Sequence, residues 1–532
     1  MPQEEAVAAN ASDASSDGLP PCPSPATTSI HRLTDAECGY SYIEFPPDTF
    51  FMESLAQNET FAPGVAFIPV QRWVEQPSKW GKKKKGEETG EGDNQEGNDE
   101  GDNNDRNLRL GGKKHVKESH LYEIRPGMTQ ARHICGPIAA PDGSIAVTIF
   151  GSALSSQGML YLCSFNRNSI LRLNLAAVME GLQETSTNTA KPVQCDMEIE
   201  VSSPNDVAID PSNENLLYVA GGAFQKCCLC CYPFSNSAVG VVYKITLPKE
   251  ATGDSPPVPD VTVYDDGLST LAGIEVLPDG ELWVAQLFNM FRQRQPYQRS
   301  VAWKGDDNDE QVWLADNIDV FHADNQKDAP MLLCPAYSTT SKLATNSVLK
   351  NSALSSFFLI MVQLITAGMR GEGIVQALRD PEVSLAFSNT YIKEGEAPKP
   401  IRLIFLRPNP KQTETATVYG NRAIVGEGDP QFRVPPAAAA FHFEIDLKDT
   451  RANHQPWVVY NRRHGKPRGR REFFNEQVTH AAQLKGSDGK SYVVCVNFEE
   501  PRVLLLDDQA FLNVIGQQEQ QQQADLNAAV VH

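Results

Sequence analysis

The sequence predicts an all-β fold, a six-bladed β-propeller with four-stranded blades, a helical insertion in the fifth blade and disordered loops. Short apolar, β-branched or aromatic segments recur along the chain, separated by Pro-Asp-Gly or Asn-rich turns. Strand–turn–strand units repeat, as in "NDVAIDPSNENLLYVA" and "AGIEVLPDGELWVA". A parallel sheet would need helices between its strands, and helical patterns occur only in one late insertion.

Six candidate units follow one another, and each begins with a strand expected to line a central channel. Units of roughly 40 to 70 residues suit a propeller because a single blade cannot bury both of its faces. The first strands of the six units begin near Glu53, Ile145, Asn205, Ala272, Asn317 and Val478.

The expected propeller spans residues 37–511, between a low-complexity tail at 1–36 and a polar tail at 512–532. Two insertions interrupt it, an acidic loop at about 77–118 and a helical and loop segment at 341–440. The apolar run "ALSSFFLIMVQLITAGM" in the second insertion is diluted by Ser, Gln and Thr. Its apolar core is shorter than the ~18 to 20 residues of a membrane span, so we expect a buried or docked helix there.

Charge and cysteine content bound the function. The formal charge is −20, but residues 87–105 carry nine carboxylates in a polar, Gly-rich context that predicts disorder. The remainder is moderately acidic, which argues against nucleic acid as the main partner. The chain begins without a secretory pattern, and its 11 cysteines suggest no disulfide framework. A reducing, cytoplasmic setting is therefore expected.

Polar residues at the starts of the channel strands converge from different blades. They are Glu53 of "FMESLAQ", Asn205 of "PNDVAID", and Asp316 with Asn317 of "LADNIDV". Hard oxygen ligands of this kind favour Ca²⁺, with another divalent metal as an alternative. The Asn-Asp and Asp-Asn pairs also suit plain turns, in which the side chain orders the strand entry by an Asx hydrogen bond.

The chain resembles the six-bladed calcium propellers of the paraoxonase, gluconolactonase and strictosidine synthase-like superfamily. The motifs that carry the resemblance run from about residue 41 to 508 and are, in order, "ESLAQNETFAPGVAFIP", "PNDVAID", "AGIEVLPDGELWVA", "ADNIDV" and "SYVVCVNFEEPRVLLLD". The resemblance implies that Glu53, Asn205, Asp316 and Asn317 hold a catalytic metal. The family's remaining ligand position falls on Ala272, which offers no oxygen, and a water would take its place.

Two further positions bear on chemistry. Paraoxonase-like lactonases place a His-Gly in the second blade, and the matching stretch "IFGSALSS" has Phe150-Gly151 instead. His480, early in the last blade's first strand, is a candidate proton shuttle, with a plain hydrogen-bonded strand residue as the alternative. The strictosidine synthase-like acid–base residue has no secure equivalent.

The resemblance implies a calcium-dependent hydrolase of small-molecule lactones or esters. The ion would polarise the carbonyl, and Asp316 would orient water or attack directly. The competing hypothesis is a non-catalytic propeller that keeps a structural ion and acts as an interaction or membrane-associated module. A condensing activity of the strictosidine synthase type is a third.

Two further segments, one rich in cysteine and one rich in arginine, have several possible roles. "CCLCC" (Cys227 to Cys231) has Cys-x-x-Cys spacing without a second pair nearby, so zinc, lipid attachment and oxidation-prone thiols all stay open. "RRHGKPRGRR" (Arg462 to Arg471) suits a solvated loop, a localisation signal or, together with the lysines at 82–85, weak contact with an anionic membrane surface.

Overall fold

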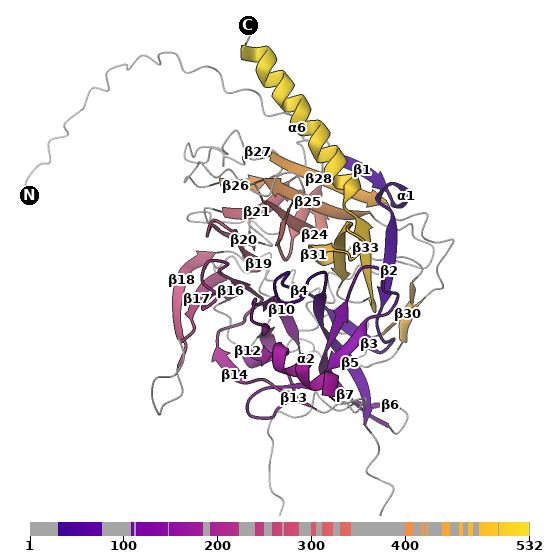
Figure 1. Cartoon of the computed structure of the whole chain (residues 1–532), viewed down its shortest axis with the longest axis vertical. Helices are drawn as coiled ribbons and strands as arrows, with labels where there is room; N and C mark the ends of the chain where they lie inside the picture. The colour runs from indigo at the N-terminus through magenta and orange to yellow at the C-terminus, as the bar shows by residue number, and fades with distance from the viewer. Residues whose placement is uncertain are drawn as a thin grey trace, which may run out of the picture.

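The chain folds as a mainly-β propeller in this computed structural model. Figure 1 shows its sheets arranged around a common centre, with helix α6 extending away from them. The structure describes residues 30–76, 108–110, 113–146, 148–184, 192–222, 240–248, 258–268, 271–286, 299–304, 311–322, 330–341, 400–407, 416–419, 422–423, 439–446, 457–460, 467–471, 478–497 and 500–530.

Five sheets of four or more strands form the described part of the propeller, where the sequence predicts six blades. Three of them have four strands each. The first of these contains β10 (Ile149–Leu154), β11 (Met159–Ser164), β12 (Ser169–Asn174) and β14 (Met197–Glu200). The second contains β15 (Asp206–Ile209), β16 (Leu216–Gly222), β17 (Gly240–Thr246) and β18 (Asp260–Leu268).

The third four-stranded sheet joins the two ends of the fold. Its strands are β31 (Val478–Lys485), β32 (Ser491–Asn497), β33 (Arg502–Asp507) and the early strand β2 (Tyr40–Glu44). The outermost pair is antiparallel, with Tyr40 opposite Leu506 and Glu44 opposite Arg502. A strand from the start of the chain therefore completes the sheet made by its end.

A six-stranded sheet precedes these along the chain. Its strands are β3 (Thr49–Met52), β4 (Ala56–Gln57), β5 (Ala66–Gln76), β6 (Leu108–Leu110), β7 (Lys113–Ile124) and β8 (Arg132–Cys135). Strands β6 and β7 begin inside the segment 77–118 that the sequence assigns to an acidic loop. The acidic run itself lies outside the described residues.

The largest sheet has 11 strands. They are β1 (Ile30–Thr34), β19 (Leu271–Val276), β20 (Leu282–Gln286), β21 (Arg299–Lys304), β22 (Gln311–Ala315), β23 (Asp319–Phe321), β24 (Met331–Ser341), β25 (Ile401–Arg407), β26 (Ala416–Tyr419), β27 (Arg422–Ala423) and β28 (Ala439–Asp446). Two expected channel strands, β19 and β23, belong to this one sheet. Strand β25 lies in the expected insertion 341–440 yet pairs on both sides, with β24 and β28.

Shorter elements complete the described chain. Two-stranded pairs join β9 (Ile138–Ala139) to β13 (Val193–Gln194), and β29 (Trp457–Tyr460) to β30 (Pro467–Arg471). The helical elements are α1 (Asp35–Cys38), the 3₁₀ turn η3 (Phe165–Arg167), α2 (Leu175–Glu184) and α6 (Gln509–Val530). Strand β1 and α1 fall within the expected tail 1–36, and α6 occupies the expected polar tail 512–532.

The predicted Asp-Gly turns form as their chemistry requires. In the turn between β19 and β20, Gly280 has a φ of 86° and the Asp279 carboxylate accepts the Glu281 N–H at 3.0 Å. The turn between β31 and β32 repeats this arrangement, with Gly489 at a φ of 80°. A left-handed glycine after an Asx hydrogen bond reverses the strand without strain.

The core lies where adjacent sheets pack face to face. One cluster joins Ile68 and Tyr122 of the six-stranded sheet to Leu484 and Leu505 of the closing sheet, the one formed by β2, β31, β32 and β33. Another joins strands β25 and β28 to the closing sheet and to helix α6. Phe405 lies at its centre, and its ring contacts the rings of Phe321, Phe443 and Phe511 at centroid distances of 4.9–5.3 Å.

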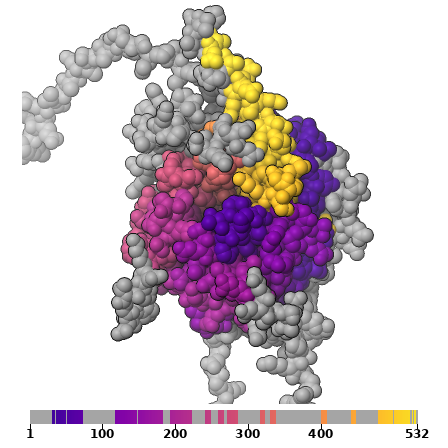
Figure 2. All heavy atoms as spheres, viewed as in Figure 1, coloured from indigo at the N-terminus to yellow at the C-terminus, as the bar shows by residue number. Residues whose placement is uncertain are grey.

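Helix α6 begins on this core and then extends beyond it, as the space-filling view in Figure 2 also shows. Phe511 and Ile515, four residues apart on one helix face, are buried. Further along, Gln518 contacts the His31 ring and Glu519 pairs with Arg407 at 2.7 Å. The Gln-rich sequence therefore forms a helix whose first turns are anchored by apolar residues.

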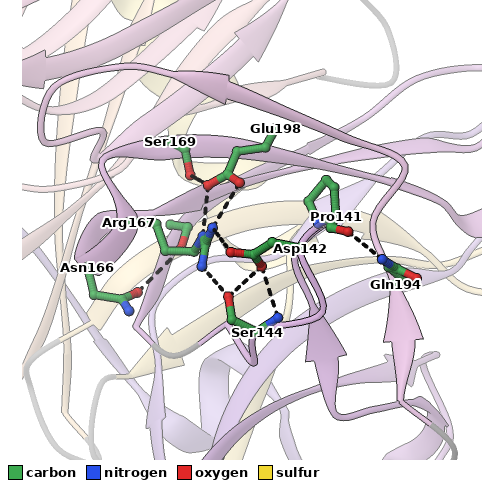
Figure 3. Close-up of polar contacts among 9 residues, drawn as sticks. Pro141, Asp142, Ser144, Asn166, Arg167, Ser169, Gln194 and Glu198 are labelled. Carbon is green, nitrogen blue, oxygen red and sulfur yellow. Dashed lines mark hydrogen bonds and ion pairs between the residues drawn. The ribbon is translucent and has the colours of Figure 1, made fainter. Parts of the chain in front are cut away.

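A polar network holds the outer part of the sheet formed by β10, β11, β12 and β14 (Figure 3). Arg167 donates to both oxygens of Glu198 at 2.8 and 2.9 Å, and to Asp142 at 3.1 Å. Its guanidinium also contacts the Ser144 hydroxyl. Ser169 donates to Glu198 at 2.8 Å. One arginine thus joins β14 to the turn that carries Asp142 and Ser144.

Candidate metal centre

The starts of the strands that were expected to line a channel contact one another in chain order around the centre. Next to Glu53, Ser54 donates its hydroxyl to the Phe150 carbonyl at 2.6 Å. The following residue, Gly151, donates its N–H to the Asn205 carbonyl at 2.6 Å. A Cβ on Gly151 would lie 2.2 Å from Asp206 Oδ1, so only glycine allows this approach. Strands β4, β10 and β15 are therefore held side by side at one end.

The contacts continue from β15 to β19. The Asn205 amide donates Nδ2–H to the Leu271 carbonyl at 3.0 Å. Asp206 Oδ2 accepts the Ile274 N–H at 3.0 Å, and its Oδ1 accepts the Val207 N–H at 2.9 Å. The Asn-Asp pair thus does serve as turn and strand-entry chemistry, but it bonds to the next strand as well as to its own.

The circle closes through β23 and β31. A Cβ on Gly273 of β19 would lie 2.7 Å from Asn317 Cα, which shows how closely the two segments pack. Asn317 donates its N–H to the Thr479 carbonyl at 3.1 Å. Thr479 donates its hydroxyl to the Glu53 carbonyl at 2.8 Å and returns the path to its start. Glu53, Asn205, Asp316 and Asn317 therefore belong to one continuous ring of contacts.

The four predicted ligands are removed from solvent to different degrees. Glu53, Asp316 and Asn317 are buried, and Asn205 is half-buried. Within the described part of the chain, the buried amide oxygens of Asn205 and Asn317 accept no hydrogen bond. A buried oxygen without a partner costs about 1–3 kcal/mol, and a bound cation would offset that cost. These residues fit a hard divalent ion.

Buried carboxyls gather at the same ring. Burial raises the pKa of Asp316 well above its usual range, and the neighbouring Asp206 raises it further. Burial also raises the pKa of Asp206, to about 7, while nearby His480 opposes that rise. Like charges this close favour either a proton or a metal ion between them. The arrangement therefore concentrates negative potential where the amide oxygens are unsatisfied.

His480 lies beside the ring rather than in it. Its Nδ1 accepts the Leu55 N–H at 3.3 Å, and its Nε2 lies 3.6 Å from Asp319 Oδ2. Gln57 Nε2 lies 3.5 Å from the same Asp319 oxygen. Because Nδ1 is an acceptor here, the neutral ring carries its proton on Nε2, which faces Asp319.

Three acidic residues near the ring are absent from the sequence-based set. Asp206 follows Asn205 directly, while Asp319 and Glu275 lie on β23 and β19. Burial raises the pKa of Glu275 well above its usual range, and Asp319 and Asp206 add to the rise. Alternation along a strand could have indicated two of them, because Asp319 and Glu275 each lie two residues beyond a ring position.

The structure shows the surroundings of the two positions that depart from the resemblance. The Phe150 side chain packs into the core between sheets, with its ring centroid 5.6 Å from that of Phe51 and 5.0 Å from that of Phe165. A histidine there would be buried among aromatic rings, and Gly151 is the residue at the ring. Ala272 is fully buried and offers no side-chain oxygen.

The other segments that the sequence singled out add no further metal site or membrane span among the described residues. Among the described residues, no group of three or more His, Cys, Asp or Glu side chains is arranged to hold a metal, and two of the four candidate ligands here are asparagines. Cys227 to Cys231 and the apolar run at 353–369 lie outside the described residues. The basic run at 462–471 is described only where it forms β30. In the described part, no helix is long and apolar enough to cross a membrane.

Comparisons with known proteins give no sequence family. No family model matches the chain, and no curated protein matches it in sequence. Solved structures give distant matches to propeller enzymes. An inactive variant of virginiamycin B lyase from Staphylococcus aureus with quinupristin is 12% identical, with a TM-score of 0.21, over 55% of this chain and 85% of the lyase.

Two further enzymes match at the same distance. A luciferin-regenerating enzyme is 8% identical, with a TM-score of 0.26, over 59% of this chain and 92% of the enzyme. The PQQ-bound aldose sugar dehydrogenase from Streptomyces coelicolor is 12% identical, with a TM-score of 0.20, over 36% of this chain and 59% of that enzyme. Values this low carry no argument about activity. The chain is a mainly-β propeller with distant structural likeness to propeller enzymes.

Proposed function

We propose that the protein binds Ca²⁺ at the ring through Glu53, Asn205, Asp316 and Asn317, and hydrolyses small-molecule lactones or esters there. The observation that carries the metal site is the pair of buried amide oxygens, on Asn205 and Asn317, that accept no hydrogen bond within the described residues. They lie in the same ring of contacts as buried carboxyls. Oxygen-only ligands with neutral amides among them suit Ca²⁺ better than smaller or softer ions.

The chain's own groups would divide the chemistry between them. A bound Ca²⁺ supplies a Lewis acid that polarises a carbonyl. Asp316 is assigned to the metal and to orienting water or attacking the carbonyl. His480 is assigned to proton transfer, because its Nε2 proton faces Asp319 and the Leu55 N–H fixes the ring. Asp319 and Gln57 position this histidine.

The proposal includes a six-bladed count. Strands β19 and β23 both belong to the 11-stranded sheet, yet each starts at its own point of the ring. Counting that sheet as two blades gives the six channel strands β4, β10, β15, β19, β23 and β31. This division matches the six unit starts expected from the sequence.

The alternative is a non-catalytic propeller with a structural ion, acting as an interaction or membrane-associated module in the cytoplasm. Phe150 and Ala272 favour it, since the positions that the resemblance gives to a histidine and a ligand hold a core aromatic ring and a methyl group. Both functions need the ion, so metal binding is tested first and catalysis second.

The first experiment is a Ca²⁺ titration with thermal unfolding of wild type, Asp316→Ala and Asn317→Ala. A ligand that binds only the folded state stabilises it by about 2.7 kcal/mol at a hundredfold excess over Kd. We expect a Ca²⁺-dependent rise in Tm that both variants lose. The matched control is Asp260→Ala, which removes an exposed carboxylate on β18 and should respond like wild type. An equal rise in all four proteins refutes the site.

The second experiment measures Ca²⁺-dependent hydrolysis of a panel of lactones and aryl esters. Wild type should hydrolyse at least one of them, and His480→Gln should lower kcat by about 10² to 10⁴ while keeping the Ca²⁺-dependent Tm rise. Calcium binding without hydrolysis across the panel would favour the non-catalytic alternative.

A further inference from the structure

Exposed apolar side chains gather on β18, the outer strand of the sheet formed by β15, β16, β17 and β18. Among the described residues, the exposed large apolar side chains are those of Leu182 on α2 and of four residues on or just before β18, namely Val258, Val261, Val263 and Tyr264. Figure 1 shows β18 at the outer margin of the molecule, with β16 and β17 beside it. Apolar side chains that gather on one surface in this way are typical of interaction sites.

The exposed valines continue rows of side chains that begin in the core. Val261 lies opposite Ile245, which lies opposite Leu217. Leu217 and Ile245 belong to a buried cluster shared with the sheet of β10, β11, β12 and β14. Val263 ends the next row, opposite Tyr243. Because directly opposed residues of neighbouring strands share a face, a strand added beyond β18 would extend both rows and bury the two valines.

The backbone of β18 can accept such a strand. In the described part of the chain, β18 pairs only with β17. The pairing is regular from Asp260 to Val263, after which a bulge shifts the register. A strand at the edge of a sheet presents N–H and C=O groups that have no partner in the sheet. The regular stretch therefore offers backbone donors and acceptors beside the exposed valines.

Carboxylates determine the charge of this edge. Asp260 begins β18, and Asp265 and Asp266 follow the bulge. Lys244, one strand inward and opposite Thr262, supplies a single positive charge. Within the described residues, Asp265 and Asp266 form no ion pair, and the Asp265 carboxylate accepts only the Asp266 N–H, at 2.8 Å. The edge is therefore acidic as well as apolar.

This charge disfavours a second copy of the chain as the occupant of the edge. Two antiparallel β18 strands would bring Asp260 of one copy toward Asp265 and Asp266 of the other, and a parallel pair would align identical carboxylates. Like charges opposite each other destabilise paired strands, whereas opposite charges stabilise them. The edge instead fits a strand that carries positive charge.

We propose that β18 binds an extended segment of a partner protein by adding it to the sheet as a further strand, and that this segment alternates apolar residues with Lys or Arg. Alternate side chains of a strand lie on one face, so the apolar residues of the partner would cover Val261 and Val263. Its cations would neutralise Asp265 and Asp266. In this mode of recognition the main chain supplies affinity and the alternate side chains supply specificity.

The test titrates the full chain against the fluorescently labelled peptide Lys-Val-Lys-Val-Lys-Val and follows its fluorescence anisotropy. Wild type should bind the peptide saturably. The double variant Asp265→Asn/Asp266→Asn should weaken binding by about tenfold, because two cross-strand charge pairs are lost. Val263→Ser should weaken it by about fivefold, because the added strand would bury less apolar surface.

Matched variants remove the same chemistry elsewhere. Glu180→Gln/Glu200→Gln neutralises two exposed carboxylates on α2 and on another edge strand, β14. Leu182→Ser removes the exposed apolar side chain that lies away from β18. Both should bind the peptide like wild type. If they weaken binding as much as the β18 variants do, the peptide does not bind at β18 and the proposal is wrong.

Two control peptides separate strand addition from simple attraction between charges. Lys-Val-Lys-Pro-Lys-Val has the same charge, but its proline cannot donate to a strand ladder, and Glu-Val-Glu-Val-Glu-Val reverses the charge. Each should bind wild type at least about tenfold more weakly. With Lys-Val-Lys-Val-Lys-Val bound, the amides of β18 should exchange hydrogen more slowly than in the free protein.

Three results would overturn the proposal. Equal binding of the proline peptide would reduce the interaction to charge alone. No binding of Lys-Val-Lys-Val-Lys-Val would mean that the carboxylates only keep the edge from pairing. A concentration-dependent dimer that Val263→Ser abolishes would assign the edge to a second copy of the chain.

Discussion

Replacing Gly273 with alanine tests the close packing of β19 against the segment that carries Asp316 and Asn317. The added Cβ would lie 2.7 Å from Asn317 Cα, 2.7 Å from the Ile318 nitrogen and 2.9 Å from the Asp316 carbonyl oxygen. All three are backbone atoms. Since ordinary contact begins near 3.4 Å, the segment would have to retreat by 0.7 Å (3.4 minus 2.7).

The size of the effect follows from two opposing contributions. Overpacking of this kind costs about 3 kcal/mol at the upper end of its usual range. Alanine restricts the unfolded chain more than glycine does, which offsets up to about 1 kcal/mol. We therefore expect Gly273→Ala to lower the free energy of unfolding by about 2 kcal/mol and to weaken Ca²⁺ binding, because two proposed ligands move with the segment.

Urea unfolding followed by circular dichroism measures this change. The matched control is Gly516→Ala in α6, where a Cβ meets no atom within 4 Å. Alanine in a helix should stabilise that variant by about 0.5–1 kcal/mol. If the unfolding midpoints of Gly273→Ala and Gly516→Ala shift together, β19 does not pack against residues 316–318 and the ring of contacts is wrong.

Three other predictions concern packing and pH. Phe405→Ala should lower the free energy of unfolding by about 3–5 kcal/mol because the ring is fully buried among three others. Val263→Ala, at a residue that is 58% exposed, should change it by less than about 0.5 kcal/mol. Equal effects in denaturant titrations would show that β25 does not pack in the core. Arg167→Met should cost about 1 kcal/mol above pH 4.5. Hydrogen bonding from Arg167 lowers the pKa of Glu198, so this difference should vanish as pH falls through that lowered value, and a pH-independent difference in Tm would contradict it. Burial, and then His31, lowers the pKa of His442 to about 3, so between pH 6.5 and about 3 the unfolded chain binds a proton that the folded chain excludes. The free energy of unfolding should therefore decrease as the pH is lowered through that window, and His442→Leu should make this decrease smaller. Parallel profiles of Tm against pH for wild type and His442→Leu would contradict the prediction.

The alternating pattern of apolar residues predicted most of the strands in the fold. Alternating apolar residues and Asp-Gly turns located the strands that begin near Asn205, Ala272 and Val478, because both signals are local and backbone-driven. Strand β25 escaped this reasoning because its neighbours in sequence suggested an insertion, and only pairing with β24 and β28 reveals it. Local pattern does not specify which distant strand will accept a partner.

Helix α6 shows a different limit. Its Gln-rich run has little amphipathic pattern, so composition alone suggested a tail. Two apolar residues near its start, Phe511 and Ile515, reach the core and hold the helix there. Tertiary packing, more than intrinsic propensity, usually stabilises a helix of this composition.

The candidate site was predicted in part. The sequence located the segments that meet, since turn chemistry and a channel strand coincide at Asn205 and Asn317. It did not indicate that Asp206 would bond across to the next strand, or that Asp319 would face His480. Those contacts depend on how neighbouring blades are staggered, which no single segment of sequence encodes. Metal binding and activity stay predictions.

The pairing of β2 with β33 has a consequence for how the protein is made. Tyr40 is translated 466 residues before its partner Leu506 (506 minus 40). Until then the nascent chain exposes an open edge at each side of the incomplete propeller, and both edges can join other strands. The propeller should therefore close only after β33 has been translated, and a premature stop before β31 should yield a product that aggregates instead of a smaller working domain.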